Sequence, residues 1–193
     1  MSGISKALLF LVSCVFTQNV VLVRMFAGSA FFRRERRVEA AAWLGLAAAL
    51  AMTLTALCGW IVYNKALVPL GVGHLQILAY VLIAAGAAWL SGLLVGRINP
   101  AAGKAINGDA WLLAADCALL GAALLGAEAS LGTSVLQGLF GGLGFLLAMV
   151  LMAGVEDRIA TSNVPKAMRG LPISLVAASL IALAFMGFMG LGA

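Results

Sequence analysis

The sequence predicts an all-α integral membrane protein with six transmembrane helices arranged as an inverted repeat of three plus three, and its composition gives the first evidence. Hydrophobic residues make up 64% of the 193 positions and charged residues only 10%, with a mean hydropathy of +1.11. A soluble domain is about half apolar and about a quarter charged. Folding in water would leave a large apolar surface exposed, so we expect lipid to be the solvent.

The apolar residues fall in six long stretches, and nearly all of the charge lies in the gaps between them. The stretches cover residues 7–31, 40–63, 75–95, 110–127, 134–153 and 171–191. About 20 apolar residues span the hydrocarbon as a helix, and backbone groups in lipid must be hydrogen-bonded within their own segment. Each stretch is therefore expected to be a helix, and residues 1–193 a single membrane domain.

Basic residues are distributed unequally among the predicted loops. The loops 32–39, 96–109 and 154–170 hold four, two and three lysines and arginines, nine in all, and they lie on one side. The opposite side holds only Lys6 and Lys65. Basic loops stay in the cytoplasm. Both termini are therefore predicted to be periplasmic, with the chain in a bacterial inner membrane.

The chain divides into two related halves, residues 1–96 and 109–193. Gly45-Leu46-Ala47 followed by Ala51-Met52-Thr53-Leu54 resembles Gly142-Leu143-Gly144 followed by Ala148-Met149-Val150-Leu151. Each segment lies in the middle helix of its half. An odd number of helices per half inverts the repeat across the membrane, a plan typical of transporters, whose sites lie near the midplane where helices are interrupted.

Polar residues inside the first and fourth predicted helices mark the candidate site. The first helix contains Asn19 and Arg24, and the fourth contains Asp116 beside Cys117. A charge inside a membrane helix is costly and usually marks a pathway or a pair. In one interpretation Asn19 bonds a neighbouring helix and Arg24 extends to the membrane surface. In the other, Arg24 and Asp116 pair near the pseudo-twofold axis or line an ion pathway.

Several motifs, spread over nearly the whole chain, resemble a known family. They are Gln18-Asn19-Val20-Val21-Leu22-Val23-Arg24, Cys58-Gly59-Trp60, Asp116-Cys117-Ala118-Leu119-Leu120-Gly121, Asn163-Val164-Pro165 with Arg169-Gly170, and Ala182-Leu183-Ala184-Phe185-Met186-Gly187-Phe188. These motifs resemble the RnfA family of membrane subunits, from the Rnf ion-translocating electron-transport complex. The last two are similar to RnfA rather than to its paralogue RnfE. The equivalent subunit of the sodium-pumping NADH:quinone reductase is a more distant relative.

The resemblance implies a six-helix inverted repeat whose first and fourth helices are broken near the midplane. It implies one cysteine at each break, and a [2Fe–2S] cluster held by two cysteines of RnfA and two of an RnfE partner. Four thiolates are the usual ligand set for such a cluster. The cluster then relays electrons between flavoprotein and iron–sulfur subunits on the two faces of the membrane.

The sequence departs from the family at this implied metal site. The second family cysteine matches Cys117, but the first falls at Ser29, where the family has Gly-Leu-Cys-Pro-Phe, and Ala30 replaces the proline. Asp116 stands where the family has asparagine. Serine is a harder, poorer ligand for iron than a thiolate, and Cys14 lies about 22 Å from position 29 along a helix. The cluster is thus bound by three cysteines and Ser29, bound with an altered potential, or lost.

Three functions follow as hypotheses. The first is an RnfA-like subunit of a redox-driven ion-translocating complex, inactive alone, with Cys117 and Ser29 at a cluster shared with an RnfE-like partner. The second is an inverted-repeat transporter of ions or small solutes, whose site is Asn19, Arg24, Ser29 and Asp116. The third is a metal-free scaffold subunit of the same complex.

Overall fold

The computed structural model describes residues 11–17, 19, 38–100, 116–127, 129–165 and 168–188, and these residues form helices and turns with no strand among them. The long helices are α2 (Val38–Val62), α4 (Gln76–Ile98) and α8 (Leu131–Thr161), and the shorter ones are α7 (Cys117–Gly126) and α9 (Leu171–Met186). Short helical turns are η1 (Ser13–Thr17), η2 (Tyr63–Leu67), α3 (Val68–Leu70) and η3 (Gly73–Leu75). The all-α fold class is confirmed.

Three helical stretches of the described chain are long and apolar enough to cross a membrane. They are Val38–Leu67, Gly73–Ile98 and Leu131–Thr161, and they match the second, third and fifth predicted spans. The helices α7 and α9, in the fourth and sixth predicted spans, are also apolar but shorter. The first predicted span is described only in residues 11–17 and 19, which include η1.

The helix α8 continues past the end of its predicted span. Hydropathy predicts a loop from residue 154, but the helix runs through Glu156, Asp157 and Arg158 to Thr161. Hydropathy marks the end of the apolar environment, whereas a helix can extend into water until its last carbonyl groups find partners. The hydroxyl groups of Thr161 and Ser162 both donate to the carbonyl oxygen of Arg158, at 2.9 Å each, and so satisfy one carbonyl of the last turn.

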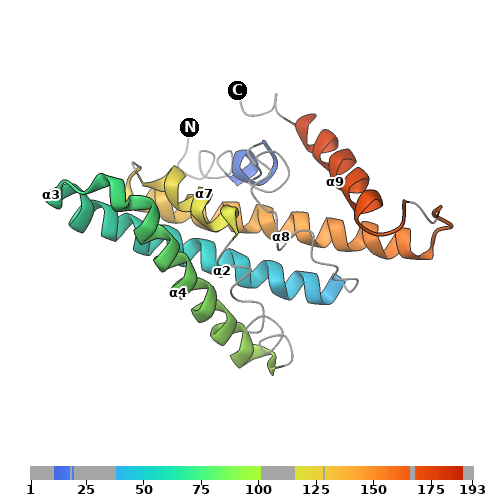
Figure 1. Ribbon diagram of the computed structural model, residues 1–193, viewed down its shortest axis with the longest axis horizontal. Coiled ribbons are helices and arrows are strands. Elements are labelled where there is room, and N and C mark those ends of the chain that lie inside the picture. Colours follow the sequence, from blue (N-terminus) through green and yellow to red (C-terminus); the bar gives the residue numbers. More distant parts are fainter. Residues whose placement is uncertain are drawn as a thin grey trace.

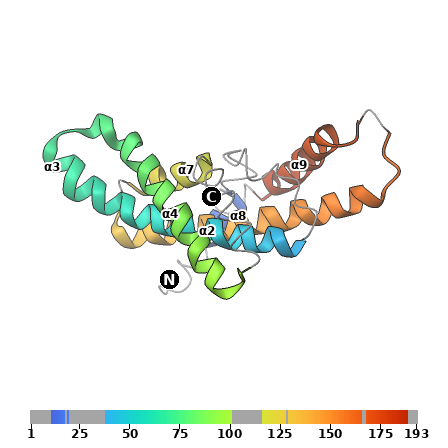
Figure 2. The same ribbon diagram turned by 60° about the horizontal axis from the view of Figure 1, so that its bottom comes forward.

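The middle of the molecule is the packed pair α2 and α8, which run side by side in both views (Figures 1 and 2). Glycines allow the two backbones to approach. A Cβ atom added to Gly142 would lie 2.6 Å from the Cα of Ala49, and one added to Gly45 would lie 2.9 Å from the Cα of Leu146. Carbon atoms in contact are about 3.5–4.0 Å apart, so this packing requires glycine at both positions.

The two close contacts are related by the predicted repeat. Gly142 follows Gly45 by 97 residues (142 − 45), and Leu146 follows Ala49 by the same number (146 − 49). Nine of the ten buried residues of α2 have a buried counterpart in α8 at this offset. The pairs are Ala41/Gly138, Leu44/Gly141, Gly45/Gly142, Ala47/Gly144, Ala48/Phe145, Ala51/Ala148, Met52/Met149, Thr55/Met152 and Ala56/Ala153. A two-fold axis between α2 and α8 would exchange the two helices and so give each buried residue of one a buried counterpart in the other. The matched pattern supports the inverted repeat.

The helices α4 and α7 pack against this central pair, and α9 follows α8 at one end of the molecule, at an angle to it (Figures 1 and 2). Their outer faces carry large apolar side chains. Leu82 and Trp89 on α4 are 69% and 60% exposed, and Leu180 on α9 is 61% exposed. Lipid tails are as apolar as leucine, so these faces fit a hydrocarbon environment.

Candidate functional site

Asn19 is fully buried beside the end of η1. This turn ends at Thr17, and residue 19 is not helical. The side-chain Nδ2 of Asn19 donates to the carbonyl oxygens of Val15 at 2.8 Å and of Gly144 at 3.1 Å. The first bond spans four residues, as backbone bonds of an α-helix do, so the side chain satisfies a carbonyl group at the helix end. The second bond joins this end to α8.

The contact between Asn19 and α8 depends on the glycine at position 144. A Cβ atom added to Gly144 would lie 3.1 Å from the Asn19 Nδ2 and 3.5 Å from the Cα of Val15. The glycine-rich segment of α8 has the composition of a helix-packing surface, and the structure adds a carbonyl oxygen that accepts from Asn19. Sequence reasoning missed this acceptor, because a backbone carbonyl leaves no mark in a sequence beyond the glycine that exposes it.

Asp116 is the N-cap residue of α7. Its backbone is extended, with φ −73° and ψ 123°, and its Oδ1 accepts a hydrogen bond from the backbone N–H of Ala118 at 3.2 Å. The side chain is only 1% exposed. N-cap residues satisfy donor groups of the first helical turn. The residue that interrupts the fourth predicted span therefore also starts the helix that follows.

Asn19 and Asp116 occupy equivalent positions in the two halves. They are 97 residues apart (116 − 19), the same offset that relates α2 to α8. Both side chains are buried, at 0% and 1% exposed, and both residues are non-helical and lie close to a helix end. The polar groups of the first and fourth predicted spans are thus counterparts in the repeat.

Cys117 is the first residue of α7, and its side chain is exposed on the surface of this chain. With ten residues, α7 is about 15 Å long, half of the roughly 30 Å hydrocarbon thickness. The helix packs against α8, and its other end at Gly126 leads through a short turn into the start of α8 at Leu131. The thiol of Cys117 therefore lies at the end of α7 away from this turn and is exposed on the surface of the chain.

The other cysteines lie in different surroundings. Cys14 is buried in η1, Cys58 is half-buried on α2, and neither is in a disulfide. Among the residues that the structure describes, no group of three or more His, Cys, Asp or Glu side chains could hold a metal ion. Ser29 and Arg24 of the predicted site lie outside the described residues.

Comparison with known proteins identifies the family. A family model described as Rnf-Nqr subunit, membrane protein, matches residues 7–192. The chain is 36% identical over 189 residues to the A subunit of the ion-translocating oxidoreductase complex of Azoarcus sp. (strain BH72), a match that covers 97% of this chain and 98% of that one. It is 36% identical over 183 residues to the A subunit of the Na(+)-translocating ferredoxin:NAD(+) oxidoreductase complex of Acetobacterium woodii, with 94% and 95% covered. The resemblance seen in the sequence motifs is confirmed, and the chain belongs to the Rnf-Nqr family of membrane-protein subunits.

Proposed function

We propose that this chain is the A subunit of an Rnf-type, redox-driven, ion-translocating oxidoreductase complex of the bacterial inner membrane. It works with an RnfE-like membrane partner and with flavoprotein and iron–sulfur subunits, and it has no activity alone. The observation that carries the proposal is an exposed thiol, Cys117, at the start of a half-length helix. The identity of about a third to A subunits over nearly the whole chain supports it.

Cys117 is the residue of this chain best suited to ligate a [2Fe–2S] cluster shared with the partner. Cys117 is the first residue of α7, and its thiol is exposed. Its neighbours Ala118 and Leu119 are fully buried, which holds the start of α7 in place. When bound, such a cluster accepts and donates single electrons. Ser29 is the second ligand that the family pattern implies for this chain.

The serine at position 29 leaves three states of the site to distinguish. A set of three cysteines and Ser29 would hold the cluster as the family does, or would hold it with an altered potential, since serine oxygen is the harder ligand. If the cluster is lost, the protein is a scaffold that keeps the complex together. Ser29→Cys restores the family ligand set. Its effect on the EPR signal separates a bound cluster from a lost one, and a redox titration of that signal separates an unchanged potential from an altered one.

The test is the reduced EPR spectrum of the tagged, intact complex, with the copurifying subunits identified by mass spectrometry. We expect flavoprotein and iron–sulfur subunits to copurify, and a [2Fe–2S] signal that disappears in Cys117→Ala. Cys58→Ala, a half-buried cysteine on α2, is the matched control and should leave that signal unchanged. A spectrum that Cys117→Ala does not alter contradicts the electron relay. A Ser29→Cys complex without the signal favours the scaffold.

We also propose that Asn19, Arg24 and Asp116 form the ion pathway or a structural pair at the two helix breaks. The burial of Asn19 and Asp116 at repeat-equivalent positions supports this assignment. The same observation favours a second candidate, an inverted-repeat transporter of ions or small solutes. A transporter predicts substrate-dependent flux into vesicles that contain this chain alone, whereas the first proposal predicts none. The nine basic residues of three loops support periplasmic termini.

A further inference from the structure

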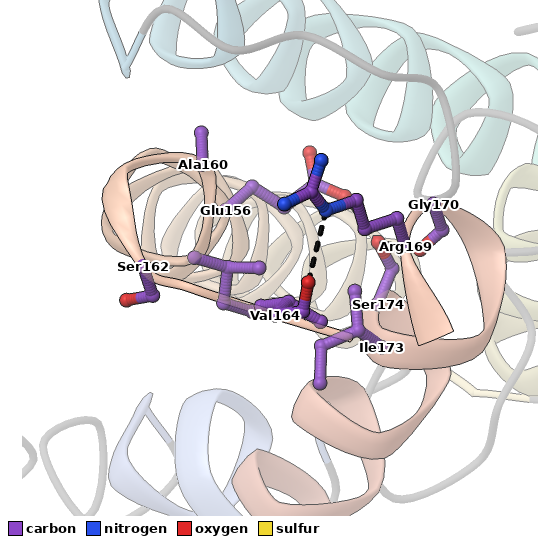
Figure 3. A pocket seen from close by; sticks show the side chains of 9 residues that line it. Glu156, Ala160, Ser162, Val164, Arg169, Gly170, Ile173 and Ser174 are labelled. Carbon is purple, nitrogen blue, oxygen red and sulfur yellow. Dashed lines mark hydrogen bonds between the residues drawn. The ribbon is translucent and has the colours of Figure 1, made fainter. Parts of the chain in front are cut away.

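A pocket of about 360 Å³ lies at the end of α8, where the chain turns back into α9 (Figure 3). The last turns of α8, the connection that follows and the first turn of α9 line it. Two opposite charges face the pocket, the Glu156 carboxylate on α8 and the Arg169 guanidinium on the connection. Ile159, Val164 and Ile173 supply an apolar part of the wall.

Hydrogen bonds orient both charged side chains. The Nε of Arg169 donates to the carbonyl oxygen of Val164 at 2.9 Å, and the guanidinium extends over the space between the two helices (Figure 3). The Glu156 Oε1 accepts from the hydroxyl of Ser174 at 2.8 Å, which links α8 to α9. The two charges are therefore held by the fold, unlike long side chains that move freely on a surface.

The depth of the pocket in the membrane indicates the kind of ligand. With 31 residues, α8 is about 46 Å long, whereas the hydrocarbon layer is about 30 Å thick. The apolar part of the helix ends at Val155, and Glu156 begins its polar last turns. These last turns extend beyond the hydrocarbon, so the pocket lies at the level of the lipid head groups.

We propose that this pocket binds the phosphoethanolamine head group of a zwitterionic phospholipid. Arg169 binds the phosphate through its terminal nitrogens, and the Glu156 carboxylate accepts hydrogen bonds from the ammonium group. An anionic head group without an amine would bring no ammonium group to the Glu156 carboxylate. A choline head group has no N–H to donate. Leu171 and Leu175 on α9, 63% and 49% exposed, offer apolar surface to the acyl chains.

The test counts lipids bound to the intact complex by native mass spectrometry after reconstitution in vesicles of phosphatidylethanolamine, phosphatidylglycerol and phosphatidylcholine. Arg169→Gln should lower the retention of phosphatidylethanolamine about tenfold, the usual effect of losing a charge-assisted hydrogen bond. Arg158→Gln is the matched control, because Arg158 lies on the same turns of α8 but does not line the pocket. Glu156→Gln should abolish the preference for phosphatidylethanolamine over the other two lipids.

Equal retention in Arg169→Gln and the parent complex overturns the proposal, as does a preference for phosphatidylglycerol that survives Glu156→Gln. Competition with free O-phosphoethanolamine distinguishes a site for the lipid from a site for the soluble head group. Retention of lipid against an excess of this competitor supports the lipid, and displacement assigns the site to the soluble molecule instead. If the Arg169→Gln complex does not assemble, Arg169→Lys is used instead, because lysine keeps the charge without the planar guanidinium. Its loss of phosphatidylethanolamine retention should be intermediate, and retention equal to that of the parent complex contradicts the assignment.

Discussion

Replacing Gly142 by alanine tests the packing on which the two-fold arrangement depends. The new Cβ would lie 2.6 Å from the Cα of Ala49, about 0.9 Å too close for carbon atoms in contact. At Gly45 the Cα of Leu146 is 2.9 Å away, about 0.6 Å too close. Overpacking costs about 1–3 kcal/mol, and alanine recovers up to about 1 kcal/mol of helix propensity. We expect a net loss of about 2 kcal/mol for Gly142→Ala and about 1 kcal/mol for Gly45→Ala.

Gly86→Ala is the matched control for both substitutions. Gly86 is exposed on α4, and a Cβ added there meets no atom within 4 Å, so the variant should be as stable as the parent or slightly more stable. The free energies of unfolding are compared in mixed micelles of increasing dodecyl sulfate content, with tryptophan fluorescence as the signal. Equal values for Gly142→Ala and Gly86→Ala would refute the close approach of α2 and α8. A loss at Gly142 with none at Gly45 would refute the two-fold relation between the helices.

Four further predictions concern polar side chains, and all are measured by the same unfolding assay. Asn19→Ala removes two hydrogen bonds and should lower the free energy of unfolding by about 1 kcal/mol. An unchanged free energy would contradict a role for these bonds. Asp116→Ala should cost about 1 kcal/mol more than Asp116→Asn, because only alanine lacks the N-cap acceptor, and equal costs would contradict the cap. Arg24→Gln and Asp116→Asn should each destabilise, with partial rescue in the double variant, whereas additive losses would exclude the pair. Trp60→Phe removes the 2.8 Å hydrogen bond from Nε1 to the carbonyl oxygen of Ala129 and should lower the free energy of unfolding by about 1 kcal/mol. A change near zero would contradict a role for this bond.

The sequence predicts those features that hydropathy and residue size determine. Apolar stretches locate α2, α4 and α8, since each segment must satisfy its own backbone in lipid. The match between the segments at Gly45 and Gly142 identifies the two halves, and the structure brings these two glycines into the same helix contact. Small residues mark surfaces where backbones approach, so this part of the packing can be predicted from residue size alone.

Other features depend on contacts between distant residues or on backbone atoms, and the sequence does not reveal them. Asn19 is recognisable as a polar residue in lipid, but its acceptor is a backbone oxygen 125 residues away. Glu156 falls in a predicted loop, whereas the extended α8 directs it to Ser174 on the next helix. The pocket beside Arg169 follows from this extension, because a loop from residue 154 would not present these side chains together.

The internal repeat and the proposed metal site have different symmetries. The offset of 97 residues relates Asp116 to Asn19, but it relates Cys117 to Val20 and Ser29 to Gly126. The pseudo-twofold axis of this chain therefore relates the two buried polar residues, Asn19 and Asp116, to each other. It does not relate Cys117 to Ser29. In the proposed four-ligand cluster, the remaining ligands come from the RnfE-like partner. In the structure, Asn19 and Asp116 are buried within the chain, whereas Cys117 is exposed on its surface.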